Sequence, residues 1–294
     1  MTDIRSQAIQ IYDAFTHEHR DRRTLLREMV ALAGSVAAAE ALIAGIAASP
    51  AAAQQVPEND DRLTASMQSF TADGVTTRYY HAQPKSPDGP LPVIVVIHEN
   101  RGLTPHIKDV ARRLALAGFI ANAPDFLSPA GGTPVDEDKA RELIGQLDMA
   151  ATVATGVRAL KVFADMPDTN HRVGVVGFCW GGAMVDRVAI AAGKSLNAGV
   201  AYYGPAPDPA EAVKVQAPLL LHYAGNDARV NATGEPWVAA LKAAGKSVEA
   251  FTYPGVEHAF NNDTSKERYN ADAAKLAWDR TVAFFHEQLD SPAG

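Results

Sequence analysis

The sequence predicts an α/β fold in which a mostly parallel, doubly wound central sheet carries helices on both faces, preceded by an N-terminal helical arm. From about Leu63 onward, short apolar runs alternate with longer helical segments. Several short runs are apolar at consecutive positions, which is typical of strands buried on both faces. The alternation implies right-handed crossovers between parallel strands.

The expected elements follow one another through a catalytic domain at residues 61–294. Strands are expected at residues 77–82, 93–98, 119–123, 172–177, 198–203, 219–223 and 250–253. Helices are expected at residues 107–117, 136–164, 181–192, 235–244 and 269–288. A single α/β domain of this size is common, so the length of 294 residues does not demand a second one.

Residues 1–60 differ from the rest and allow two readings. Arg22 and Arg23 resemble a twin-arginine export motif, followed by an Ala-rich apolar stretch at 29–48 and small residues at 51–53. Glu28 and Glu40 sit in or beside that stretch, which argues against export and against a stable membrane span. The alternative is a retained helical arm packed on the domain or on a second subunit of a homodimer. The first reading places the protein in the periplasm, the second in the cytoplasm.

The composition excludes several classes of partner and cofactor. The formal net charge of −7 gives no basic surface for a nucleic acid. The one cysteine excludes an internal disulfide and a multi-cysteine zinc site. No His-x-Glu-x-x-His spacing occurs, so we expect no metal and no organic cofactor, and a small-molecule substrate.

The strongest motif is Gly177-Phe-Cys179-Trp-Gly181, which lies between an expected strand and an expected helix. This pattern is a nucleophile elbow, typical of the α/β-hydrolase fold, with cysteine in place of serine. The two glycines allow a very tight turn, and the following helix N-terminus favours a thiolate and an oxyanion. The competing interpretation is a buried cysteine in a glycine-rich turn.

An elbow nucleophile needs a base and an acid downstream of it. Of the three downstream histidines, His222 lies inside an apolar strand and His286 on the last helix, whereas His258 follows the last strand in a loop. Asp227 follows a buried strand and would orient His258, although it could equally cap the next segment. Asn226 and Glu257 are weaker rivals for this role.

A second strand ends in His98-Glu99-Asn100-Arg101-Gly102. In this fold the loop supplies one oxyanion N–H and the residue after the nucleophile supplies another, which we assign to Asn100 and Trp180. Glu99 is unexpected beside a thiol. It could take the thiol proton, pair with Arg101 or anchor the loop.

At these motifs the sequence resembles the dienelactone hydrolase family, from about Thr71 to Leu289. The matching pieces are His98-Glu99-Asn-Arg-Gly-Leu, Gly177-Phe-Cys179-Trp-Gly-Gly, Tyr202-Tyr203-Gly204, the strand ending at Asp227, and Gly255-Val-Glu-His258-Ala-Phe260. The resemblance implies a triad of Cys179, His258 and Asp227. It also implies that Glu99 holds the resting thiol and takes its proton when substrate arrives.

The sequence departs from the family pattern where an arginine should follow the catalytic histidine by four residues, because Asn262 stands there. Arg141 lies in the region of a second family arginine without a firm alignment. Arg101 and Arg229 could supply the missing charge at the rim, or be solvated. Tyr203 and Phe260 are further candidate substrate contacts, and Tyr203 and Trp180 could wall the pocket or be ordinary core aromatics.

The sequence therefore predicts a hydrolase that cleaves an ester or a lactone through a thioester on Cys179. One alternative is a broad carboxylesterase acting on open-chain esters. Another is a non-catalytic protein of the same fold whose thiol senses oxidation.

Overall fold

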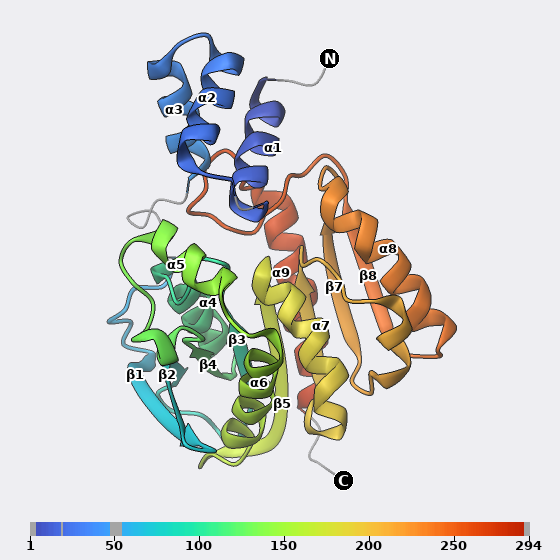
Figure 1. The fold of residues 1–294 in the computed structure, drawn as a ribbon. Helices are drawn as coiled ribbons and strands as arrows, with labels where there is room; N and C mark the ends of the chain where they lie inside the picture. Colours follow the sequence, from blue (N-terminus) through green and yellow to red (C-terminus); the bar gives the residue numbers. More distant parts are fainter. Residues whose placement is uncertain (1–3, 19, 48–54, 291–294) are drawn as a thin grey trace.

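The computed structural model describes residues 4–18, 20–47 and 55–290 (Figure 1). The small residues at 51–53, which the sequence offers as a cleavage site, lie outside these ranges. A three-helix arm sits over one end of an α/β domain, and the C-terminal helix α9 runs behind the sheet.

An eight-stranded mixed sheet forms the centre of the domain, in the order β1-β2-β4-β3-β5-β6-β7-β8. The strands are β1 (Leu63–Ala72), β2 (Val75–Pro84), β3 (Leu91–Ile97), β4 (Ile120–Pro124), β5 (Thr169–Phe178), β6 (Ala198–Tyr202), β7 (Leu219–Ala224) and β8 (Val248–Tyr253). The hairpin β1–β2 is antiparallel and joins β4 antiparallel, while β4 through β8 pair in parallel. The predicted parallel sheet is confirmed, with an antiparallel edge.

Helices cover both faces because the central strands are apolar on both sides. One buried cluster joins the sheet to α4 (Pro105–Leu116) and α9 (Ala271–Leu289). The opposite cluster joins it to α6 (Met149–Ala164), α7 (Trp180–Ala192) and α8 (Ala228–Ala243). The strand order changes direction around β3 and β5, so polar loops after these strands meet at one edge.

Two expectations about the elements are wrong, and one strand has no counterpart among the expected elements. The single helix expected at 136–164 is two helices, α5 (Glu137–Gly145) and α6, because Asp148 accepts a hydrogen bond from Ala151 N–H and starts a new helix. Helix α8 begins at Ala228, seven residues earlier than expected, because Asp227 caps it. Strand β1 was not expected, since most of its residues are exposed and it has no continuous apolar run.

The arm consists of α1 (Ile4–His17), α2 (Arg22–Ala33) and α3 (Val36–Ile46). Its helices share a small core of their own, made of Ala8, Ile9, Tyr12, Phe15, Leu25, Met29, Ala39 and Ile46. Within the described ranges no single helix is long and apolar enough to cross a membrane. Helices α2 and α3 reach that length and composition only together, and they are bent by 112° at their junction.

Candidate active site

Cys179 stands at the turn between β5 and α7 in a strained backbone conformation. Its φ of 56° and ψ of −112° lie outside the regions that L-residues prefer. A Cβ at Gly177 would collide with the carbonyl of Gly181, and a Cβ at Gly181 would collide with that of Ile97. The two glycines therefore permit the turn, and the sulfur projects from it at the N-terminus of α7.

Asp227 and His258 form the closest polar contact of the site. His258 Nδ1 lies 2.5 Å from Asp227 Oδ2, and both side chains are buried. The other carboxylate oxygen, Oδ1, accepts the Val230 N–H at 3.1 Å and caps α8. Asp227 thus contacts the His258 ring with one oxygen and caps α8 with the other.

The remaining ring nitrogen of His258, Nε2, is buried and has no hydrogen-bond partner. Cys179 Sγ, His258 and His17 hold their ligand atoms within 4.8 Å of one another. An unpartnered imidazole nitrogen near a sulfur can hold the proton of that thiol and pass it on when a substrate arrives.

Electrostatics favour a charged imidazole at this place. Burial lowers the pKa of His258, but the Asp227 carboxylate and the Cys179 sulfur outweigh burial and raise it to about 10. Burial raises the pKa of Asp227, yet the imidazole and Arg229 bring it below its usual value. At neutral pH the pair is therefore a carboxylate and an imidazolium beside the sulfur.

The rival groups lie elsewhere. His222 is buried in β7, where its ring nitrogens bond to Tyr253 and Thr281. His286 is on α9 and bonds to Asp290 and the carbonyl of Ala117. Asn226 and Glu257 are hydrogen-bonded to each other near the surface.

Glu99 lies in the cleft that Cys179 and His258 also line, and its carboxylate accepts a hydrogen bond of 2.8 Å from Asn262 Nδ2. Asn262 thus connects the loop after β3 to the loop that carries His258. Arg101 points its guanidinium to Glu137 and Asp138, at 3.4 and 3.5 Å.

The two residues assigned to the oxyanion hole share a cavity with Cys179. Asn100 and Trp180 both line the larger cavity together with Cys179. Trp180 begins α7, and its ring stacks on the His98 ring with the ring centroids 5.3 Å apart. His98 Nε2 accepts the Phe126 N–H, so Nδ1 donates to the Glu99 carbonyl and fixes the turn before Asn100.

The candidate substrate contacts separate into two groups. Tyr203 and Phe260 are fully buried behind His258, with ring centroids of Tyr203 and His258 5.1 Å apart. Arg229 lines the larger cavity, and its Nη2 is buried with no hydrogen-bond partner. Arg101 lines the smaller cleft.

Two openings lead to Cys179. The smaller cleft, about 30 Å³, has room for a water molecule or two and lies between α1, the Glu99 loop and the His258 loop. The larger cavity, about 550 Å³, lies within the usual range for a small-molecule site. Both are lined in part by arm residues, including Thr16 and His17.

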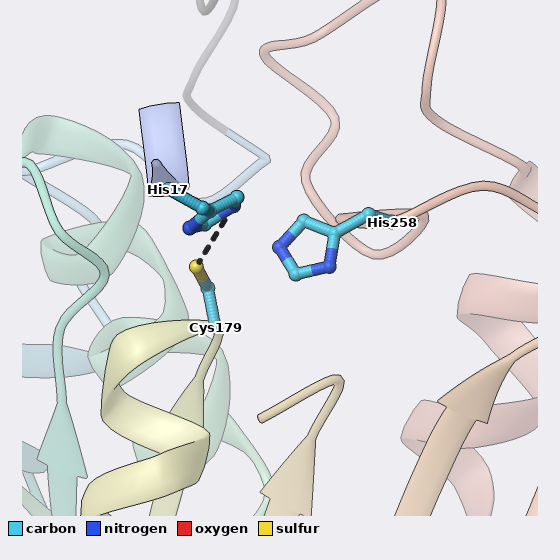
Figure 2. A group of neighbouring side chains, drawn as sticks. All are labelled: His17, Cys179 and His258. Carbon is cyan, nitrogen blue, oxygen red and sulfur yellow. Dashed lines mark hydrogen bonds between the residues drawn. The ribbon is translucent and has the colours of Figure 1, made fainter. Parts of the chain in front are cut away.

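His17 is a residue of the site that the sequence analysis did not find. Its Nε2 lies 3.9 Å from Cys179 Sγ, and its ring meets the His258 ring edge-on at 4.9 Å (Figure 2). His17 reaches the site only because the arm docks on the domain, so no local sequence motif predicts its place. One thiol and two imidazoles could also hold a zinc ion. The expectation that the reaction needs no metal stays a prediction.

A family model and several full-length relatives carry related names. A model of the dienelactone hydrolase family matches residues 77–289. A protein of Escherichia coli (strain K12), provisionally named a carboxymethylenebutenolidase, is 35% identical over 256 residues, covering 82% of this chain and 93% of its own. A similarly named protein of Methylorubrum extorquens is 32% identical and covers 94% of this chain and 98% of its own. The crystal structure of a provisionally assigned dienelactone hydrolase from Klebsiella pneumoniae superposes with a TM-score of 0.70 at 33% identity, over 76% of this chain and 99% of that one.

Proposed function

Because this chain belongs to the dienelactone hydrolase family and is a hydrolase of the carboxymethylenebutenolidase type, we propose that it cleaves a lactone or an ester through a thioester on Cys179. The observation that carries the proposal is the convergence of one sulfur, one imidazole and one carboxylate from three distant segments. Asp227 bonds His258 at 2.5 Å, and His258 Nε2 is unpartnered near the sulfur.

The reaction follows from these positions. His258 already holds the proton that the thiol gives up, so the sulfur attacks the carbonyl carbon of the substrate as a thiolate. The backbone N–H groups of Asn100 and Trp180 stabilise the oxyanion. The C–O bond then breaks, and His258 returns the proton to the leaving alkoxide. His258 next removes a proton from water, which attacks the thioester and releases the acid, so that the thiolate and the protonated ring are restored.

Glu99 has a supporting part in this proposal. Its hydrogen bond to Asn262 joins the loop of the oxyanion hole to the loop of the base. In this arrangement it holds the two loops in register. Because Glu99 lines the same cleft as Cys179, its carboxylate is the alternative acceptor for the thiol proton.

A trapped acyl group tests the nucleophile directly. The protein is mixed with 4-nitrophenyl acetate, quenched in acid within the first turnover and digested for mass spectrometry. We expect one acetyl group on the peptide that contains Cys179, removed by hydroxylamine as a thioester is. An acetyl group found on a serine or lysine peptide, with none on Cys179 at any quench time, would contradict the proposal.

Arg229 is proposed to bind an anionic group of the substrate. It stands at the first turn of α8, two residues after Asp227, and its Nη2 is buried without a partner in the cavity that reaches Cys179. A buried guanidinium donor without a partner costs free energy, which an anionic ligand would recover. Arg22, on the same cavity, is already paired with Asp138 at 3.1 Å.

We predict that Arg229→Gln raises KM for an anionic ester, such as mono-4-nitrophenyl glutarate, by about 10- to 100-fold, the value of a charged hydrogen bond. KM for the neutral 4-nitrophenyl butyrate should change little. Steady-state kinetics on both substrates measure this, with Arg22→Gln as the matched control. Equal changes in KM for the two esters would remove Arg229 from substrate recognition.

Lactones, dienelactones and open-chain aryl esters give the same thioester chemistry. A panel of the three classes at equal concentration therefore ranks them by kcat/KM and decides whether the chain acts as a lactonase or as a broad carboxylesterase.

A further inference from the structure

Helix α1 ends directly over the reactive sulfur. His17 is the last residue of the helix, and Figure 2 shows its ring above Cys179 and beside His258. The 3.9 Å contact from Cys179 Sγ to His17 Nε2 joins residues that are 162 positions apart in the chain. The arm therefore reaches the reacting atom itself, and not only the rim of the site.

The catalytic domain caps the C-terminal end of α1. The last carbonyls of a helix have no partner inside the helix and need one outside it. The Phe15 carbonyl accepts a hydrogen bond of 2.5 Å from Arg141, and the Thr16 carbonyl accepts one of 3.2 Å from Asn100. The guanidinium of Arg141 also lies 4.0 Å from the Phe15 ring centroid. A cation at this end suits the helix dipole.

Two further contacts fix α1 along its length. Asp13 and Arg268 form an ion pair at 3.3 Å with little exposure on either side. Tyr12 accepts a hydrogen bond of 3.2 Å from Arg101, in the loop after β3. Exposed ion pairs contribute little to stability, but a largely buried pair is costly to leave half-made. Removing the arm would leave Arg268 without this partner.

A second anchor joins the far end of the arm to the loop that follows His258. The carbonyl of Ile46, at the end of α3, accepts a hydrogen bond of 2.6 Å from Ser265. The carbonyl of Gly45 accepts the Glu267 N–H at 3.2 Å. The arm thus touches the nucleophile at one end and supports the segment of the base at the other.

We propose that the arm, residues 4–47, is a permanent wall of the active site and that His17 controls which molecules reach the sulfur of Cys179. The expected effect on hydrolysis rests on the proposed function. The position of the arm over the site rests only on the contacts described above. It replaces the export-signal reading of the segment, since a cleaved leader would carry His17 away.

The openings described above give His17 this control. It lines both the cleft of about 30 Å³ and the cavity of about 550 Å³, as Thr16 and Asn100 also do, and its ring nitrogen contacts the sulfur that both openings reach. The small cleft admits water, which the second half of the reaction consumes. An acyl group enters through the large cavity. The ring is neutral at pH 7, because burial and the nearby His258 and Arg229 bring the pKa of His17 well below its usual value.

The relative from Methylorubrum extorquens also has residues that align with the arm. Its alignment covers 94% of this chain, which is more than the catalytic domain alone supplies, so it extends into the arm. The alignment also covers 98% of the relative's own length.

Labelling of the thiol tests the proposal in the full-length protein without any need for turnover. N-ethylmaleimide and N-(1-pyrenyl)maleimide carry the same reactive group on a small and a large body. In wild type we expect the pyrenyl reagent to react much more slowly. In His17→Ala its rate should rise about tenfold or more, the usual effect of relieving a crowded pocket, while the small reagent gains little. Intact mass measures both rates.

Two variants keep the result interpretable. His17→Trp adds bulk at the same place and should slow both reagents below wild type. His171→Asn changes an exposed histidine of β5 and should leave both rates unchanged. Unchanged rates of both maleimides in His17→Ala and in His17→Trp would overturn the proposal, as would a mature protein from its native cells whose sequence starts after residue 47.

The two proposals fail separately. If Cys179 labels with the expected size selectivity but no ester is hydrolysed, the wall stands and the triad chemistry is wrong. If esters are hydrolysed through Cys179 while labelling ignores His17, the triad stands and the wall is wrong. Among active proteins, His17→Ala should also shift the ratio of kcat/KM for bulky over small acyl esters upward, and His17→Trp should shift it downward.

Discussion

Replacing Cys179 by alanine should lower kcat/KM for 4-nitrophenyl acetate by about four orders of magnitude, toward the rate in buffer, because removal of an activated nucleophile costs about as much as removal of the whole triad. The fold should persist. Cys179 already has a positive φ, so alanine adds no backbone strain beyond what cysteine has. Circular dichroism and thermal unfolding check the fold, and stopped-flow absorbance checks the rate.

Cys179→Ser is the matched variant for this test. It keeps a nucleophile of similar size but one that His258 must deprotonate from a much higher pKa, so we expect an activity between alanine and wild type. If wild type and both variants hydrolyse all esters and lactones only at the background rate, the chain is not a hydrolase of this mechanism. Reversible oxidation of the thiol would then favour the redox-sensing alternative.

The second large effect is expected for Asp227→Asn. A neutral amide can still cap α8, but toward the ring it offers an N–H where the imidazole needs an acceptor, so the wrong tautomer of His258 is stabilised. We expect kcat to fall by about 10³- to 10⁴-fold with little change in KM. Glu257→Gln removes the rival carboxylate, which lies near the surface and bonds Asn226, and should leave kcat close to wild type.

Asp227→Asn should also change how the free energy of unfolding depends on pH. The pKa of His258 is about 10 in the folded chain and near 6.5 when unfolded, so the folded state binds more protons between these values. The resulting stabilisation is complete below about pH 6.5 and is lost as the pH rises through 10. Urea unfolding at pH 6, 8 and 10 should show this decline in wild type and a flatter profile in Asp227→Asn. If wild type and Asp227→Asn lose stability with equal slope, the pH dependence comes from a group other than His258.

The central elements of the fold could be predicted because each is a continuous apolar run of strand length. Strand β3, Leu91–Ile97, is buried at six consecutive positions, so burial on both faces is visible in its composition alone. Strand β1 is paired only at the sheet edge and reads as a polar segment. The break before α6 depends on one capping aspartate inside a long helical pattern, which periodicity does not resolve.

The reactive centre could be predicted as far as local motifs reach. The elbow at Cys179 and the loop of His258 each have a signature, and the structure brings them together with Asp227. No sequence signature predicts the contact of Glu99 with Asn262 or that of Cys179 with His17, because these contacts depend on how two loops and an arm meet in space. The partner of Arg101 was also unpredictable for this reason, since α5 and not Glu99 supplies it.

The double attachment of Asp227 has a consequence for how this protein can diverge. One oxygen caps the start of α8, and the other contacts the His258 ring, where the proposed mechanism needs it. A change such as Asp227→Asn would therefore leave a protein that keeps its fold and its cavity but loses the proposed hydrolysis. Such a variant would bind a substrate without the proposed hydrolysis, as a receptor for the same small molecule does.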